Sequence, residues 1–195
     1  MSHKNNSQLI QQRYRSLLDR ITQRKPQVQK FVDLLHNETT WLTSPASTKY
    51  HLNIEGGLLL HSVGVAEILL RIKDTLAPHI RDESSIIVGL FHDVGKVGMP
   101  GKPYYIQEVK DGVVTGKYSI NQDLVSMGLA LRSLYLVSQY VSLSDEEAQA
   151  IAYHDGMYVP EGKSVSHREE PLLLLLHWAD MWTAKMIEEK IPKNK

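Results

Sequence analysis

An apolar run that ends in two polar side chains constrains this sequence more than any other feature. Residues 86–91 are apolar, His92 and Asp93 follow directly, and Gly95 and Lys96 come next. A buried helix that ends there would leave an imidazole and a carboxylate at the edge of the core, where both are good ligands for a divalent cation. The alternative is an ordinary helix end, in which the histidine compensates the helix dipole and Gly95 caps the helix in the left-handed conformation.

Apolar residues recur at helical spacing along most of the chain and predict an all-α protein. Capping signals mark two helix starts: Asp123 is expected to cap one helix, and Ser144 with Glu147 has the pattern of a capping box. The charged tail, residues 185–195, is expected to fray. The predicted helices cover residues 7–24, a short segment that starts at Pro26, residues 56–77, a segment that ends near His92, residues 123–140, residues 144–154 and a last helix that opens at Pro171.

Residues 104–120 interrupt the helical pattern and predict a β-hairpin. Asp111 and Gly112 lie between two groups of β-forming residues, and Asp-Gly in that setting is the strongest short hairpin signal. We expect this excursion to be an exposed flap on the helical body. Lys102 and Lys117, in or beside the flap, would either cover a site on the body or be solvated.

Composition limits the chemistry and the surroundings of the protein. The 22 basic and 22 acidic residues balance, which argues against a strongly electrostatic nucleic-acid binder. Because the chain has no cysteine, any metal must be held by nitrogen and oxygen ligands. No apolar run has the length of a membrane span or of a signal-peptide core, so we expect a soluble, cytoplasmic protein. No pattern indicates a particular oligomeric state.

A late aspartate stands where a buried charge is costly. Residues 172–176 are all leucine, which indicates a helix that is buried all round. His177 and Asp180 follow three residues apart, so they share a helix face. A buried aspartate is destabilising unless it is paired or bound to a metal, and the same argument applies to Asp93. Such residues can form a nitrogen and oxygen site whose carboxylates neutralise a divalent ion.

Three segments together resemble the motifs of the HD-domain superfamily of metal-dependent phosphohydrolases. They are Glu55–His61 (EGGLLLH), His92–Lys96 (HDVGK) and His177–Asp180 (HWAD). The Gly-Gly-Leu-Leu-x-His and His-Asp-x-Gly-Lys patterns are both typical of that family. The resemblance covers most of the chain and implies a helical-bundle domain over residues 49–190, preceded by an N-terminal helical extension over residues 1–48.

The resemblance also implies a metal site. It assigns metal-binding roles to four residues: His61, His92, Asp93 and Asp180. The cofactor would be a divalent ion (Mn, Co, Ni, Mg, Zn or Fe), and the substrate a small phosphorylated compound, nucleotide-like in character. Relatives with two metals have further histidines between the doublet and the last aspartate. His154 stands at one such position, but Asn121 and Gln122 occupy the other, so we expect one ion per chain.

The implied chemistry is hydrolysis of a phosphate ester or anhydride by a metal-activated water. Asp93 would be both ligand and proton acceptor. Lys96 would contact phosphate oxygens, or serve only the helix dipole. His154, with Asp155 beside it, would contact substrate or metal-bound water, or end its helix as a dipole partner. Two other functions stay open at this point: a di-iron oxygenase of the same architecture, and a non-catalytic signalling or binding module.

Overall fold

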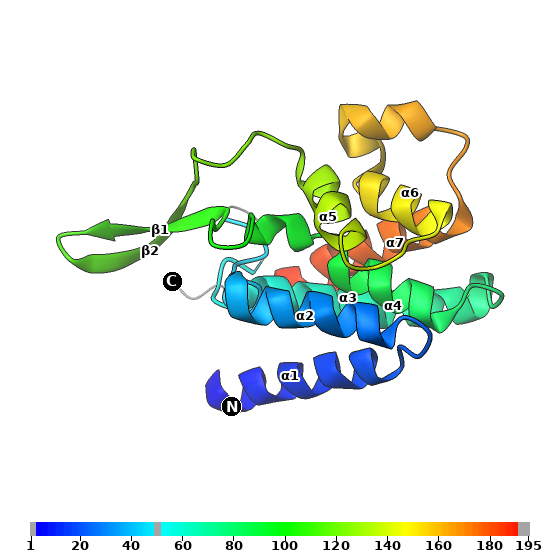
Figure 1. Cartoon of the computed structure of the whole chain (residues 1–195), viewed down its shortest axis with the longest axis horizontal. Helices are drawn as coiled ribbons and strands as arrows, with labels where there is room; N and C mark the ends of the chain where they lie inside the picture. Colours follow the sequence, from blue (N-terminus) through cyan, green and yellow to red (C-terminus); the bar gives the residue numbers. More distant parts are fainter. Residues whose placement is uncertain (1–2, 49–51, 191–195) are drawn as a thin grey trace.

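Helices α3 (Gly57–Leu76) and α4 (Asp82–Phe91) pack along each other at the centre of the structure, and α7 (Pro171–Trp182) packs against both (Figure 1). The coordinates are a computed structural model, which describes residues 3–48 and 52–190. Within these residues, no helix is long and apolar enough to cross a membrane.

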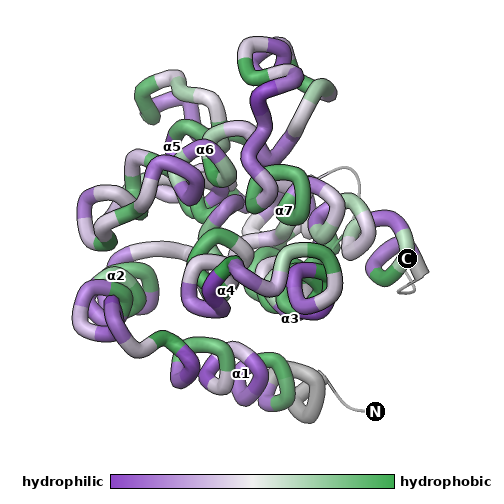
Figure 2. The backbone as a smooth tube through the Cα atoms, turned by 90° about the vertical axis from the view of Figure 1, so that its right-hand side faces the viewer, coloured by the Kyte–Doolittle hydropathy of each residue, from purple (hydrophilic) through white to green (hydrophobic). Residues whose placement is uncertain are grey.

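The remaining helices cover the two sides of this centre. Figure 2 shows α1 (His3–Asp19) below α3 and α4, with α5 (Leu129–Ser138) and α6 (Asp145–Tyr153) on the opposite side. Helix α2 (Lys25–Glu38) lies beside α4. The predicted all-α fold with a small hairpin is confirmed. The other elements are the 3-10 helices η1 (Val94–Val97), η2 (Gly156–Tyr158), η3 (Pro160–Val165) and η5 (Glu188–Lys190), the π-helix η4 (Thr183–Ile187), and the strands β1 (Tyr105–Lys110) and β2 (Val113–Ile120).

One hydrophobic core joins the N-terminal helices to the rest of the protein. The ring of Phe31 on α2 meets that of Phe91 on α4 edge to face, with centroids 5.1 Å apart. Trp41 is fully buried and lies 6.1 Å from Phe91, also between centroids. The predicted division into an extension (residues 1–48) and a domain (residues 49–190) stays a prediction, and residue 49 lies outside the described residues.

A close approach of α3 and α4 places the first candidate ligands beside each other. A Cβ atom at Gly89 would lie 2.7 Å from the Cα of Ala66, so only glycine allows the helices to come this near. Helix α4 ends at Phe91 and His92 is its C-cap. The alternative in which Gly95 is a left-handed cap of α4 is wrong, because Gly95 lies inside η1. The glycine with a positive φ, 86°, is Gly98, which ends η1.

Helix α5 begins later than its sequence predicts. The predicted helix covers residues 123–140, but α5 begins at Leu129, and Asp123 does not cap it. The preceding segment is held in an irregular conformation by side chains, because the Asn121 Oδ1 accepts a hydrogen bond from the Asp123 N–H at 2.9 Å and Arg132 Nη2 donates to the Val125 carbonyl at 3.0 Å. These local hydrogen bonds compete with those of a helix. By contrast, the capping box of Ser144 at the start of α6 is confirmed.

The hairpin projects from the helical body as the Asp-Gly signal predicts (Figure 1). Its strands pair in antiparallel fashion from Tyr105 opposite Ile120 to Lys110 opposite Val113. Asp111 and Gly112 form the turn with φ angles of 52° and 76°, as a tight hairpin requires. The strands are exposed along most of their length, and Lys102 and Lys117 are solvated.

Limited trypsin digestion is expected to cut this hairpin before the rest of the body. Lys102, Lys110 and Lys117 are exposed there, and a hairpin outside the core opens easily to a protease. Intact-mass analysis should show first internal cuts between Met99 and Tyr118 while the helical body stays whole. First internal cuts within α3, α4 or α7 would contradict the flap.

A buried ion-pair network ties the N-terminal helices to the core. The Arg24 guanidinium donates from Nε to Glu83 Oε1 at 2.8 Å and from Nη1 and Nη2 to the Glu147 carboxylate at 2.6 and 2.7 Å. The other Glu83 oxygen accepts from the Thr22 and Gln23 N–H groups at 2.8 Å. These contacts explain why α1 ends at Asp19 and not at the predicted residue 24: the chain turns to reach Glu83.

Replacing Arg24 with methionine is expected to lower the free energy of unfolding by about 3 kcal/mol, because it leaves two buried carboxylates without their cation. Burial alone would raise the pKa of Glu83 and Glu147, but hydrogen bonds from Arg24 and from backbone or hydroxyl groups outweigh it and lower both pKa values. The resulting stability is complete above the ordinary pKa of about 4.3 and is lost as the pH falls through the lowered values. This acid-dependent part should shrink in the variant. The measurement is urea unfolding between pH 2.5 and 7.

The matched control is Arg20→Met. Arg20 pairs with Asp82, but the two side chains are 48% and 43% exposed, so the loss should be at most about 1 kcal/mol. Equal losses in the Arg20 and Arg24 variants would contradict the role of the buried network.

Candidate metal centre

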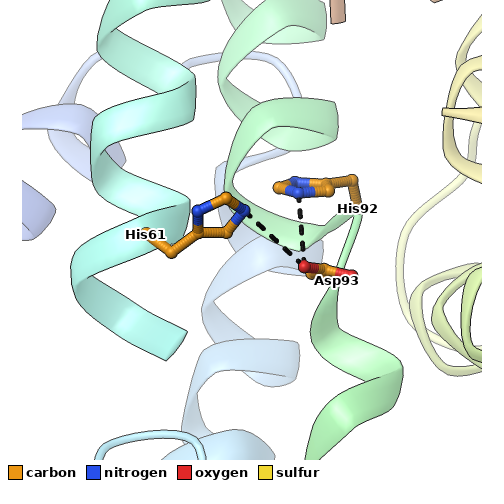
Figure 3. A group of neighbouring side chains, drawn as sticks. All are labelled: His61, His92 and Asp93. Atoms are coloured by element: carbon orange, nitrogen blue, oxygen red, sulfur yellow. Dashed lines mark ion pairs between the residues drawn. The ribbon is translucent and has the colours of Figure 1, made fainter. Parts of the chain in front are cut away.

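Polar side chains from four helices converge at the C-terminal ends of α4 and α6. His61 comes from the second turn of α3, His92 and Asp93 from the end of α4, and Asp180 from α7. His154 is the C-cap of α6. Figure 3 shows the imidazoles of His61 and His92 pointing at the Asp93 carboxylate. The structure thus brings all the sequence-predicted metal ligands together.

The donor atoms of this cluster have the close spacing of atoms that surround one ion. His61 Nε2 lies 3.1 Å from Asp180 Oδ1 and 3.6 Å from Asp93 Oδ2. Nε2 atoms of His92 and His154 each lie 3.7 Å from an Asp93 oxygen. Donor atoms fall within 4.8 Å of one another in two overlapping groups, one of His61, His92 and Asp93 and the other of His92, His154 and Asp180.

Hydrogen bonds on the far side of each ring fix which nitrogen faces the cluster. Nδ1 of His92 donates to the Gly89 carbonyl at 2.9 Å, and Nδ1 of His154 donates to the Ile151 carbonyl at 2.9 Å. Because a carbonyl can only accept, the proton sits on Nδ1 and the lone pair of a neutral ring sits on Nε2. Nε2 of both rings therefore faces the cluster, and in the neutral form of the ring this atom carries the lone pair that a metal-binding histidine uses.

The surroundings of the His92 Nε2 atom indicate whether a metal ion fits this cluster. This atom is fully buried and has no hydrogen-bond partner among residues 3–48 and 52–190. A buried polar atom without a partner is costly, and in native proteins it calls for a water or an ion. A divalent cation that accepts nitrogen and oxygen ligands would satisfy His92 and the facing carboxylates of Asp93 and Asp180 together. The residues present fit such an ion.

The carboxylates give the cluster a strong attraction for positive charge. Burial alone would raise the pKa of both aspartates, but Lys96 and the facing imidazoles hold the pKa of Asp93 well below its usual range, and the imidazoles of His61 and His92 do the same for Asp180. Burial likewise opposes charge on His61 and His154, yet their acidic partners raise the pKa of His61 to about 10 and that of His154 to about 9.

His92 differs from the other two imidazoles. Burial dominates there and lowers its pKa to about 4, so its ring is neutral at physiological pH. A neutral imidazole with an inward lone pair is the form that binds a metal ion.

Two of the predicted catalytic and substrate-binding residues, Lys96 and Asp155, lie at the rim of the cluster. Lys96 Nζ is 2.5 Å from Asp93 Oδ2, so the lysine pairs with a candidate ligand and not with the last carbonyls of α4. Asp155 is 45% exposed at its side chain, and its Oδ1 lies 3.9 Å from His154 Nε2. His177 donates from Nδ1 to the His154 carbonyl at 2.7 Å, which holds the end of α6 against α7.

One buried acid at the cluster is absent from the sequence-based expectations. Residues 185–195 are expected to fray, but residues 183–190 continue the last helix as η4 and η5, and Glu188 is 4% exposed. Residues 191–195 lie outside the described part of the chain. The Glu188 carboxylate reaches Nδ1 of His61 at 3.0 Å. Glu189 and Lys190 follow it in the sequence, so Glu188 has the appearance of one more charged residue of the tail.

Comparison with known proteins supports this arrangement. The family model of the HD domain matches residues 58–181, which include every candidate ligand from His61 to Asp180. Searches of curated proteins and of solved structures returned no match. The match spans more than half of the 195 residues. The helical fold of the structure and its clustered histidines and aspartates agree with an HD domain. The chain belongs to the HD domain family, whose members are generally metal-dependent phosphohydrolases.

Proposed function

We propose that the protein is a phosphohydrolase that uses one divalent ion, held by His61, His92, Asp93 and Asp180, to hydrolyse a nucleotide-like substrate. The observation that carries the proposal is the buried Nε2 atom of His92, which faces two carboxylates and has no hydrogen-bond partner within the described residues. Membership of the HD domain family supports the same chemistry.

Each residue around the ion would have a separate role in hydrolysis. When bound, the ion lowers the pKa of a water and polarises a phosphoryl oxygen. Asp93 would take up the proton of the attacking water, because its two carboxylate oxygens face the imidazoles of the cluster. Lys96 holds the Asp93 carboxylate and can pair with phosphate oxygens at the rim. His154, whose Nε2 lies 3.7 Å from Asp93 Oδ1, would move a proton to the leaving oxygen, and the partly exposed Asp155 beside it would position the substrate.

A pocket beside the cluster supports a substrate with a planar, apolar part. It is lined by the aromatic residues Tyr153, Tyr158, His177 and Trp178, together with apolar side chains. None of the candidate ligands lines this pocket, and its link to the cluster is His177, whose Nδ1 donates to the His154 carbonyl. Nucleobases stack on aromatic side chains of this kind, and a nucleotide would place its phosphate toward the histidines and its base in the pocket.

The alternatives fit the described residues less well. A di-iron oxygenase needs additional ligands, but Asn121 at the expected histidine position uses its side chain to bind the Pro103 carbonyl and the Asp123 N–H. A non-catalytic module does not need a complete set of candidate ligands, and all of those predicted from the sequence lie in the cluster.

The experiment is a panel of phosphomonoesters, phosphodiesters and nucleoside triphosphates, each with Mn²⁺, Co²⁺, Ni²⁺, Mg²⁺, Zn²⁺ or Fe²⁺. Products are read by phosphate release and by chromatography, and Asp93→Asn is the inactive control. Hydrolysis that depends on metal and on Asp93 supports the proposal. Two irons per chain without hydrolysis would instead favour the oxygenase, and metal binding without turnover a binding module.

A further inference from the structure

The acid that the sequence did not reveal, Glu188, contacts the first histidine of the cluster on the side away from the other candidate ligands. His61 Nδ1 lies 3.0 Å from Glu188 Oε1 and 3.2 Å from Glu188 Oε2. The two side chains are 1% and 3% exposed, so water does not screen this contact. An ionised carboxylate can only accept, so the proton of a neutral His61 sits on Nδ1 and its lone pair sits on Nε2, which faces Asp93 and Asp180.

A π-helix brings Glu188 to this position. Glu188 comes eight residues after Asp180, and at about 100° per residue an α-helix would place it about 80° further round the axis. Residues Thr183–Ile187 form the π-helix η4, and its i→i+5 hydrogen bonds add a residue to the turn. With one residue absorbed by the wider turn, the rotation about the helix axis from Asp180 to Glu188 is within about 20° of two full turns. Asp180 and Glu188 therefore lie on one face of the helix and approach His61 from its two ends.

Tight packing holds η4 against α3. Thr183 is 1% exposed, and a Cβ atom at Gly64 would lie 3.0 Å from the Thr183 Cγ2. Gly64 comes one helical turn after His61. The π-helix is thus pressed onto the stretch of α3 that carries the candidate ligand.

Glu188 also differs in kind from the groups that orient the other imidazoles. His92 and His154 each donate from Nδ1 to a neutral backbone carbonyl of their own helix. His61 alone among these three donates to a charged side chain, and that side chain comes from a different segment. A carboxylate behind a metal-binding histidine fixes the ring and raises the basicity of the ligand nitrogen.

We infer that Glu188 is a positioning residue of the metal centre: it holds His61 as an Nε2 ligand, and the π-helix η4 brings its carboxylate to the His61 ring. The inference rests on the proposed metal site. It extends the functional unit past Asp180 to a residue beyond the matched part of the family, which ends at residue 181. Glu188 acts through His61 and does not itself touch the ion or the substrate.

The test is metal affinity, measured by calorimetric titration of the metal-free full chain with Co²⁺ and with Mn²⁺. Glu188→Ala removes the acceptor and should weaken binding by about 10- to 100-fold, the range for outer partners of metal ligands. Glu188→Gln keeps an oxygen that can accept from Nδ1 but removes the charge, so its affinity should lie between those of the parent and Glu188→Ala. The visible spectrum of the Co²⁺ protein should change in Glu188→Ala, because the His61 ring is no longer fixed.

Glu189→Ala is the matched control. Glu189 is the next residue, is exposed, and pairs with Lys185 at 3.0 Å on the solvent side of the helix. Its removal should leave affinity and spectrum unchanged.

The outcomes separate the inference from the proposed function on which it rests. If the parent protein binds Co²⁺ and Mn²⁺ but both Glu188 variants bind them with unchanged affinity, Glu188 is only a packing residue and the inference fails alone. Lower thermal stability of the metal-free variants with unchanged affinity leads to the same conclusion. If the parent protein binds neither ion, the inference and the proposed metal site both fall. Glu188→Gln keeps the size of the side chain and decides the question should Glu188→Ala not fold.

Discussion

Asp180→Ala is expected to lose most of its bound metal, with affinity reduced by more than the roughly 100-fold that outer partners contribute. Asp180 Oδ1 lies 3.1 Å from His61 Nε2, and its carboxylate supplies one of the two candidate anionic ligands. A site with few ligands has none to spare, so phosphate release should fall to near background. The measurements are metal content after dialysis and calorimetric titration.

Asp19→Ala is a suitable control for this variant, because the Asp19 side chain is 77% exposed and lies at the end of α1, away from the cluster. It should keep both metal and activity. Full metal occupancy in Asp180→Ala would show that the ion is held without Asp180 and would contradict the proposed site.

The second large effect is expected at His154. His154→Ala should lower turnover by roughly 10²-fold, the scale of a positioned acid–base group, and should keep the ion held by the other candidate ligands. The physical reason is its position, because Nε2 lies 3.7 Å from Asp93 Oδ1 and 3.9 Å from Oδ1 of the partly exposed Asp155. Turnover and metal content are measured on the same preparation, with a substrate that the parent protein hydrolyses.

His79→Ala is the control, since His79 is exposed and lies in the loop before α4, in a different pocket. Nearly unchanged turnover in His154→Ala would leave His154 as an ordinary helix end. Joint loss of metal and turnover would instead make it a ligand, as its grouping with His92 and Asp180 also allows.

Features that depend on neighbouring residues could be predicted from the sequence. The turn at Asp111 and Gly112, the capping box at Ser144 and the helix that opens at Pro171 all follow from local backbone chemistry, and the structure has each of them. Asp93 and Asp180 stood out in the sequence for a related reason, whereas His61 was assigned only through the family resemblance. A carboxylate next to an apolar run, as at Asp93, conflicts with burial unless a cation or a hydrogen bond balances it.

Features that depend on particular side-chain contacts, some of them local and some between distant segments, appeared only in the structure. Helix α5 begins late because Arg132 binds the Val125 carbonyl, a contact that no helical periodicity reveals. Glu188 is the strongest case. In sequence it belongs to a charged, helix-forming tail, and a regular α-helix would turn it away from His61. The π-helix and the packing of Thr183 on Gly64 reverse this, and they arise from the fit of two helices. Residue types along a helix thus identify which groups can bind a metal, whereas tertiary packing selects the groups that orient them.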